Sequence, residues 1–190
     1  MVERSLLSLF EAHQGKVTDK WSFYLSEYDR ILSPYRKKPI RLLEVGVQNG
    51  GSLEIWSQYF TDAEIILGCD IDPNCEDLEF EDSRIRVIVG DVNDSGTRSR
   101  IQELSDRFDV IIDDGSHHSG DIIKSFADYF DLVSDGGVFI IEDLHCSYWK
   151  EFAGGLFDPY SAISFLKHLA DIANFQHWGV AMDMGDILKG

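Results

Sequence analysis

Short, nearly continuous apolar runs recur along the chain, with segments of helical spacing between them. Five such runs lie at residues 40–47, 64–71, 85–89, 109–112 and 137–141. Runs that are continuous rather than alternating are typical of parallel strands buried on both faces of a sheet. The pattern therefore predicts five strands of a largely parallel sheet.

The segments between and around these runs have the spacing of amphipathic helices. At 52–59, Leu53 and Trp56, followed by Phe60, fall on one side. Further helices are expected at residues 6–12, 21–32, 95–104, 119–132 and 160–175. Strands that alternate with helices predict an α/β fold with a doubly wound, mostly parallel sheet.

The pattern predicts one domain over residues 1–190, because no repeat or low-complexity linker interrupts it. Within it we expect an N-terminal helical segment at 1–39, a ligand-binding core at 40–145, and a C-terminal helix and tail at 146–190. Residues 178–182 have the character of a further strand.

Composition narrows the possible partners. The chain has 34 acidic and 17 basic residues and a formal charge of −17, which argues against nucleic acids and anionic membrane surfaces. No apolar run approaches the roughly 20 residues of a membrane span, and the start does not resemble a signal peptide. Cys69, Cys75 and Cys146 form no C-x-x-C pair, which favours reduced thiols in a cytoplasmic protein.

Acidic residues gather where the predicted strands end. In an open parallel sheet these ends share one edge, and ligands bind there near the point where the strand order reverses. The first strand runs into a glycine-rich turn, Glu44-Val-Gly-Val-Gln-Asn-Gly-Gly-Ser52, which lacks the G-x-G-x-x-G of a diphosphate site. An acid beside this turn suits a nucleoside that carries positive charge, which describes S-adenosylmethionine. The predicted cofactor-binding residues are Glu44, Gly46, Gly50, Ser52, Asp70, Asp91 and Asp113.

Four stretches resemble one family closely. LLEVGVQNGGSLEIWSQYF, GCDIDP, IIDDGSHHS and IEDLHCSYW look like the macrocin-type sugar O-methyltransferases and their cephalosporin-hydroxylase-like relatives, and GKVTDK at residues 15–20 looks like a G-x-TDK element of that group. The resemblance implies a Rossmann-like methyltransferase fold and an S-adenosylmethionine-dependent methyltransferase. Its acceptor would be a hydroxyl of a sugar or a glycosylated natural product.

The reacting half of the site is predicted at the fourth and fifth strand ends. Asp114, Glu142 and Asp143 supply hard oxygen ligands, which suit Mg²⁺ or Mn²⁺. His117 is the candidate base, because a neutral imidazole accepts a proton near pH 7. The resemblance implies the same arrangement, with magnesium held at these two strand ends and a histidine base in the DGSHH turn.

Several alternatives stay open at this point. Asp113 or Asp114 could cap the helix that follows, and His118 or His145 could act in place of His117. Two histidines and a carboxylate could instead hold iron in an oxygenase or zinc in a hydrolase, and a non-enzymatic nucleotide-binding protein is a third possibility.

The C-terminal region departs from the family pattern. Methyltransferases of this fold end their sheet with a strand hairpin, and the residues after 175 offer room for about one strand. The hairpin is thus expected to be incomplete, with a second copy of the chain or the rest of a larger protein covering the sheet edge.

Overall fold

The sheet has five parallel strands in the order β3-β2-β1-β4-β5. The structure is a computed structural model, and it describes residues 4–179. The strands are β1 Arg41–Val45, β2 Ile65–Asp70, β3 Ile85–Val89, β4 Phe108–Asp113 and β5 Val133–Ile141. The order reverses between β1 and β4, and this switch point is where such sheets bind ligands.

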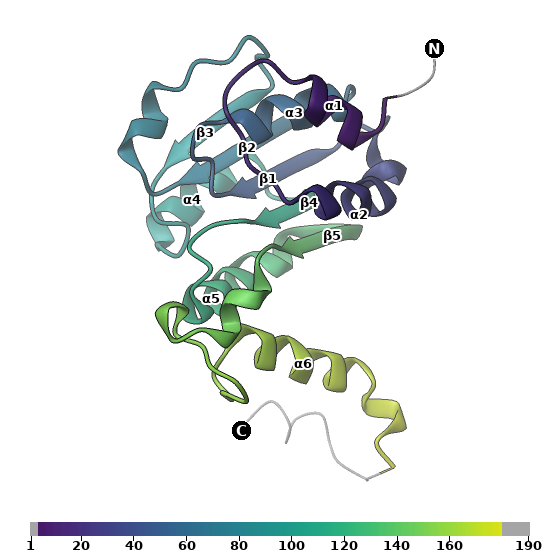
Figure 1. The fold of residues 1–190 in the computed structure, drawn as a ribbon, viewed down its shortest axis with the longest axis vertical. Coiled ribbons are helices and arrows are strands. Elements are labelled where there is room, and N and C mark those ends of the chain that lie inside the picture. The colour runs from purple at the N-terminus through teal and green to yellow at the C-terminus, as the bar shows by residue number, and fades with distance from the viewer. Residues whose placement is uncertain (1–3, 180–190) are drawn as a thin grey trace.

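Helices cover both faces of the sheet (Figure 1). They are α1 Leu6–Ala12, α2 Ser22–Leu32, α3 Gly51–Tyr59, α4 Ser95–Leu104, α5 Ser119–Tyr129 and α6 Ala162–Ala173. The first three pack on one face, and α4 and α5 pack on the other. Helix α6 lies against α5, where the Phe126 and Phe165 rings are 5.8 Å apart. The predicted doubly wound α/β fold is confirmed.

Alternate residues of the central strands supply the two halves of the core. Leu42 and Ile112 face the side covered by α1, α2 and α3, whereas Leu43 and Ile111 face α4 and α5. All four side chains are fully buried. Burial on both faces explains why these strands read as continuous apolar runs.

Strand β5 differs from its prediction. It begins at Val133 rather than at residue 137, and it includes the polar Ser-Asp-Gly-Gly stretch. The β4–β5 register is irregular between Phe108 and Val110, and Gly136 has a φ of 76°. Among residues 4–179, β5 pairs with a strand on one side only. The polar residues are therefore tolerated because this part of the strand lies at an exposed edge.

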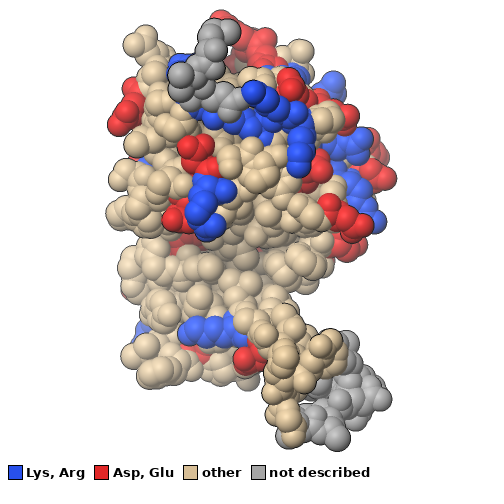
Figure 2. All heavy atoms as spheres, turned by 90° about the vertical axis from the view of Figure 1, so that its right-hand side faces the viewer, with Lys and Arg blue, Asp and Glu red and all other residues tan. Residues whose placement is uncertain are grey.

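The other predictions from the sequence concern the cysteines, membrane spans, the C-terminal strand and the partners that the charge excludes. Cys69, Cys75 and Cys146 are buried and unpaired, and no helix in the described range is long and apolar enough to span a membrane. The strand expected at 178–182 and the incomplete hairpin fall almost wholly outside the described residues. On the face shown in Figure 2, Lys and Arg side chains lie among Asp and Glu side chains. Avoidance of nucleic acid and a cytoplasmic location stay predictions from composition.

Candidate active site

A cavity of about 580 Å³ opens at the carboxyl ends of the strands. The turns after β1, β2, β3 and β4 line it, together with the segment that leads into α2. Of the predicted cofactor-binding residues, it contains Gly46, Ser52, Asp70, Asp91 and Asp113. These five residues, which follow four different strands or end them, thus surround one space.

Gly46 brings the turn after β1 against the turn after β4. Its φ is 89°, and a Cβ at this position would lie 2.1 Å from the carbonyl oxygen of Asp114. Only glycine fits so close a backbone approach without displacement. The glycine-rich turn after β1 and the turn that carries Asp114 and His117 are therefore in direct backbone contact.

Asp70 has a structural task that the sequence did not reveal. Its Oδ2 accepts hydrogen bonds from the backbone N–H groups of Val47 and Gln48, at 2.7 and 2.8 Å, and its Oδ1 accepts one from Asp72 N–H at 2.9 Å. The carboxylate thus shapes the glycine turn. A carboxylate oxygen has two acceptor positions, so the predicted contact with ribose hydroxyls stays open.

Glu44 does not line the cavity, contrary to its predicted place at the cofactor. Its side chain is fully buried behind the cavity wall, and its Oε2 accepts a hydrogen bond from the Ser52 hydroxyl at 2.6 Å. Its Oε1 is 3.5 Å from Lys20 Nζ. Burial raises the pKa of Glu44 to about 7, although Lys20 and Ser52 oppose the shift. Gly50 is also absent from the lining, and its Cα faces the Phe80 ring.

The raised pKa of Glu44 predicts a pH-dependent stability. The folded chain keeps this proton up to about pH 7, whereas an unfolded glutamate releases it near 4.5. The stabilisation is therefore complete below the unfolded pKa and is lost as the pH rises through the folded one. Between these limits we expect the free energy of unfolding to fall by up to about 3 kcal/mol more in the wild type than in Glu44→Gln. Urea titrations of both proteins at pH 5 and pH 7.5 measure this difference. An equal change in the free energy of unfolding of the two proteins between these pH values would contradict the prediction.

Asp113 offers an unpartnered acceptor beside the cavity. Its side chain is nearly buried, and burial raises its pKa. Its Oδ1 accepts a hydrogen bond from Gly115 N–H at 3.3 Å and the neighbouring Ser125 hydroxyl opposes the rise of the pKa, but among residues 4–179 no donor lies within hydrogen-bond distance of its Oδ2. A buried carboxylate oxygen of this kind favours a ligand that brings a donor or a positive charge.

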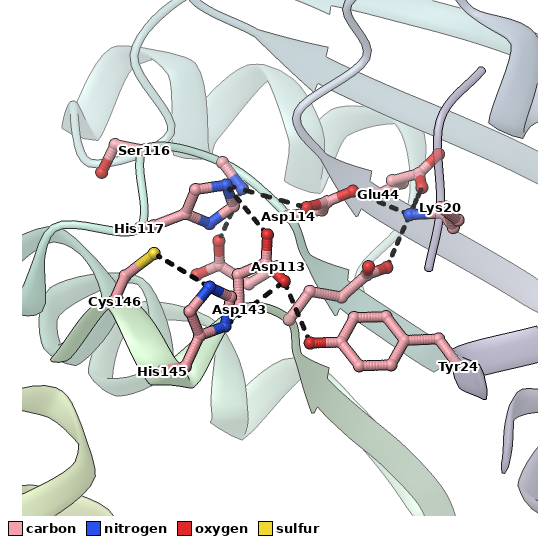
Figure 3. A network of polar contacts seen from close by, with 12 residues as sticks. Lys20, Tyr24, Glu44, Asp113, Asp114, Ser116, His117, Asp143, His145 and Cys146 are labelled. Carbon is pink, nitrogen blue, oxygen red and sulfur yellow. Dashed lines mark hydrogen bonds and ion pairs between the residues drawn. The ribbon is translucent and has the colours of Figure 1, made fainter. Parts of the chain in front are cut away.

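Asp114, His117 and Asp143 form a cluster whose ligand atoms all lie within 4.8 Å of one another. His117 Nε2 is 4.0 Å from Asp114 Oδ1 and 3.8 Å from Asp143 Oδ2 (Figure 3). These distances are too long for direct hydrogen bonds, yet they suit groups that surround a small ion. The other oxygens are already engaged, since Asp114 Oδ2 binds Lys20 and Asp143 Oδ1 accepts the Tyr24 hydroxyl.

Two members of this cluster have left-handed backbone conformations. His117 has a φ of 59° and Asp143 a φ of 52°. Such conformations cost on the order of 1 kcal/mol or more in residues other than glycine, and they gather at functional sites. They turn the His117 and Asp143 side chains toward the space they share.

Glu142 lies outside this cluster, although it was predicted as a metal ligand. Its Oε1 accepts hydrogen bonds from Lys20 Nζ and from the Tyr28 hydroxyl, both at 2.5 Å. Burial raises the pKa of Glu142, while Lys20 lowers it. The left-handed turn at Asp143 points these two consecutive acids in different directions, so that Asp143 faces His117 while Glu142 faces Lys20.

The other two candidate histidines, His118 and His145, differ from His117 in their surroundings. His118 is exposed, outside the cavity lining, and its ring is 5.4 Å from that of Phe152. His145 Nδ1 is 3.8 Å from Asp143 Oδ1. His145 also lines a second, apolar cavity of about 520 Å³ between α2 and the end of β5. Asp143 borders both cavities.

Three residues of this site were missed from the sequence, namely Lys20, Tyr24 and Tyr28. The two tyrosines belong to an amphipathic helix, where aromatic residues are expected as core, so their hydroxyl contacts gave no signal. Lys20 was quoted as part of the G-x-TDK element without a role. Its presence in that element was the only available hint.

The parallel sheet, the glycine turn after β1 and the acids at the strand ends together define a Rossmann-like methyltransferase. The chain belongs to the methyltransferase-domain family, whose profile matches residues 43–144. It is 34% identical over 183 residues to demethylmacrocin O-methyltransferase of Streptomyces fradiae, covering 89% of this chain and 45% of that protein. It is 36% identical over 182 residues to mycinamicin VI 2''-O-methyltransferase of Micromonospora griseorubida, covering 88% and 44%.

A solved structure agrees with these relatives. The MycE methyltransferase from the mycinamycin biosynthetic pathway, in complex with Mg, SAH and mycinamycin VI, superposes with a TM-score of 0.82 at 31% identity. The match covers 96% of this chain and 49% of MycE. The resemblance inferred from the sequence is therefore confirmed. The chain spans about half the length of the relatives it matches.

Proposed function

We propose that this chain is the catalytic part of an S-adenosylmethionine-dependent, Mg²⁺-assisted O-methyltransferase that acts on a sugar hydroxyl of a glycosylated natural product. The observation that carries the proposal is the position of the Asp114–His117–Asp143 cluster, which borders the cavity at the switch point of a methyltransferase sheet. The two relatives above are named O-methyltransferases, and a third, 30% identical, is named an 8-demethyl-8-alpha-L-rhamnosyl tetracenomycin-C 2'-O-methyltransferase; these names support the substrate class.

The cofactor half of the site fits S-adenosylmethionine, which when bound supplies the methyl group on a positively charged sulfur. Asp113 Oδ2 is a buried acceptor without a donor among residues 4–179 and would receive the ammonium of the methionine part. Asp70 and Asp91 line the cavity at the ends of β2 and β3, where they would bind the ribose and the adenine. The backbone of the Gly46 turn would approach the ligand closely.

The metal half fits a hard divalent ion. Asp114 Oδ1 and Asp143 Oδ2 face the common space, while Lys20 and Tyr24 hold the opposite oxygen of each carboxylate. Carboxylates are the ligands that Mg²⁺ prefers, and the ion would make a neighbouring hydroxyl more acidic. Glu142 would support the site through Lys20.

His117 would take the proton of the acceptor hydroxyl. Its Nε2 lies between the two carboxylates, and Mg²⁺ prefers oxygen to imidazole ligands, so His117 is better suited to act as the base. The apolar cavity on the other side of Asp143 gives an apolar aglycone a place beside the reacting sugar. Because neither His118 nor His145 joins the cluster, the described residues do not form the two-histidine site that the oxygenase alternative requires.

Calorimetry with the reaction product S-adenosylhomocysteine, compared with NAD⁺, tests the class of cofactor. We expect S-adenosylhomocysteine to bind and NAD⁺ not to bind, because an acid-lined cavity repels a diphosphate. Methyl transfer to a panel of macrolide and aromatic-polyketide glycosides, followed by mass spectrometry with and without EDTA, then tests the reaction. Binding of NAD⁺ alone would contradict the proposal, and transfer unaffected by EDTA would remove the metal from it.

A further inference from the structure

Residues 13–20, which we call the strap, connect α1 to α2 across one wall of the cofactor cavity. Val17, Thr18, Asp19 and Lys20 all line that cavity. Val17 is 72% exposed, so the strap covers the cavity without being part of the core. The predicted cofactor-binding residues all came from strand ends, and none of them came from this segment.

One end of the strap is fastened to helix α3. Lys16 N–H donates to Glu54 Oε2 at 2.8 Å, and His13 Nε2 is 3.0 Å from the Lys16 carbonyl oxygen. A Cβ on Gly51 would lie 2.3 Å from the Lys16 carbonyl oxygen and 2.6 Å from that of Val17. The strap therefore lies directly on the first turn of α3, and glycine at position 51 makes room for it.

The other end is fastened by a single side chain. Lys20 Nζ contacts Asp114 Oδ2 at 2.7 Å, Glu142 Oε1 at 2.5 Å and Glu44 Oε1 at 3.5 Å, and the Lys20 side chain is 5% exposed. These three acids belong to β1 and to the ends of β4 and β5. An ammonium group has three N–H donors and no acceptor, and Lys20 donates to Asp114 and Glu142 while it lies within ion-pair distance of Glu44.

Between these two ends the strap packs on Gly51 through Val17 and Thr18. Among the hydrogen bonds of residues 4–179, none involves Val17, Thr18 or Asp19. The position of the cavity wall therefore depends on the contact with α3 at one end and on the buried Lys20 ammonium at the other.

We propose that Lys20 is a positioning residue that clasps the strap over the cofactor cavity, by joining it to the buried acids of β1, β4 and β5. The clasp deepens the proposed function, because the strap would form a wall of the S-adenosylmethionine site. It would also fix which oxygen of Asp114 faces His117, since Lys20 holds Oδ2 and leaves Oδ1 free.

A purely structural role is the rival explanation. Lys20 would then only neutralise buried carboxylates, and its loss would lower the overall stability without a selective effect on the strap. The two roles differ in the local motion of residues 14–19 in a chain that is still folded, and hydrogen–deuterium exchange measures that motion without any ligand.

The experiment compares Lys20→Met with Lys124→Met, which removes a surface lysine paired with one carboxylate, Asp128. For Lys20→Met we expect the amides of residues 14–19 to exchange at least about tenfold faster, and the Kd for S-adenosylhomocysteine to rise about tenfold to a hundredfold, as for the loss of charged hydrogen bonds. Lys124→Met should match the wild type in both measurements.

A second variant keeps the proposal testable if Lys20→Met does not fold. Gly51→Ala leaves every charge in place but pushes a methyl group against the strap carbonyls, so it should speed the same exchange and weaken the same binding. If the exchange rates of residues 14–19 and the Kd of Lys20→Met both stayed within twofold of wild type, the proposed role of Lys20 would be wrong. Wild-type behaviour of Gly51→Ala beside a binding loss in Lys20→Met would also contradict it. If the wild type itself failed to bind S-adenosylhomocysteine, the proposed function would fail, while the exchange data would still test the clasp.

Discussion

Replacing His117 with asparagine should lower kcat by about a hundredfold to ten-thousandfold, which is the usual contribution of a general base. Asparagine tolerates the left-handed backbone that His117 adopts, so the turn after β4 should keep its shape. Because the proposal gives His117 no role in holding cofactor or metal, the Kd for S-adenosylhomocysteine and for Mn²⁺ should stay within about threefold of wild type. Single-turnover kinetics and equilibrium titrations supply the two measurements.

Two further histidine variants complete this test. His168→Asn changes an exposed residue of α6 that lines neither cavity and should behave as wild type. His118→Asn discriminates between the neighbouring histidines, and its kcat should fall much less than that of His117→Asn. If the two effects were reversed, the base would be His118, and the exposed position of its ring would have to change during the reaction.

Replacing Asp143 with asparagine should abolish most metal binding. The substitution keeps the size of the side chain and a residue type that accepts positive φ, but it removes the charge of an oxygen that faces His117 across 3.8 Å. We expect the affinity for Mn²⁺ to fall at least about a hundredfold, because a site with two carboxylates loses one of them. Electron paramagnetic resonance of free Mn²⁺ measures the change.

Asp131→Asn is the matched control for the metal, since Asp131 is an exposed acid that pairs with Arg98. It should bind Mn²⁺ as the wild type does. The proposal would be wrong if Glu142→Gln lost the metal while Asp143→Asn kept it, because the ion would then lie on the side of Lys20. Together, the His117 and Asp143 variants should separate the loss of proton transfer from the loss of metal.

Much of the fold could be predicted because burial dictates it. Strands β1, β2 and β4 are covered on both faces, so most of their residues are apolar, and this shows in the sequence; Glu44 is the buried exception within β1. Strand β5 was only half recognised, because its first residues lie at an exposed edge where a Ser-Asp-Gly-Gly stretch is tolerated. An apolar run indicates a strand because the strand is buried, so an exposed part of a strand cannot be recognised in this way.

The site could be predicted in its position but not in its contacts. Strand ends converge in any parallel sheet, so the order of the strands along the chain was enough to bring Asp70, Asp91 and Asp114 to one edge. The contacts of Glu142 and Asp143 depend on one left-handed residue, which is invisible in a pair of adjacent acids. The role proposed for Lys20 depends on contacts with Asp114 and Glu142, which lie 94 and 122 residues away in the sequence.

The missing side chain at Gly46 has a mechanical consequence. Since the backbone of Gly46 touches the backbone of Asp114, the turn that would lie beside the methyl donor and the turn that carries the proposed base are held together by main-chain contact. A slight tilt of β1 against β4 would carry both turns along together. The distance over which the methyl group travels would then be set by main-chain contact, and it would be insulated from the side-chain motions around it.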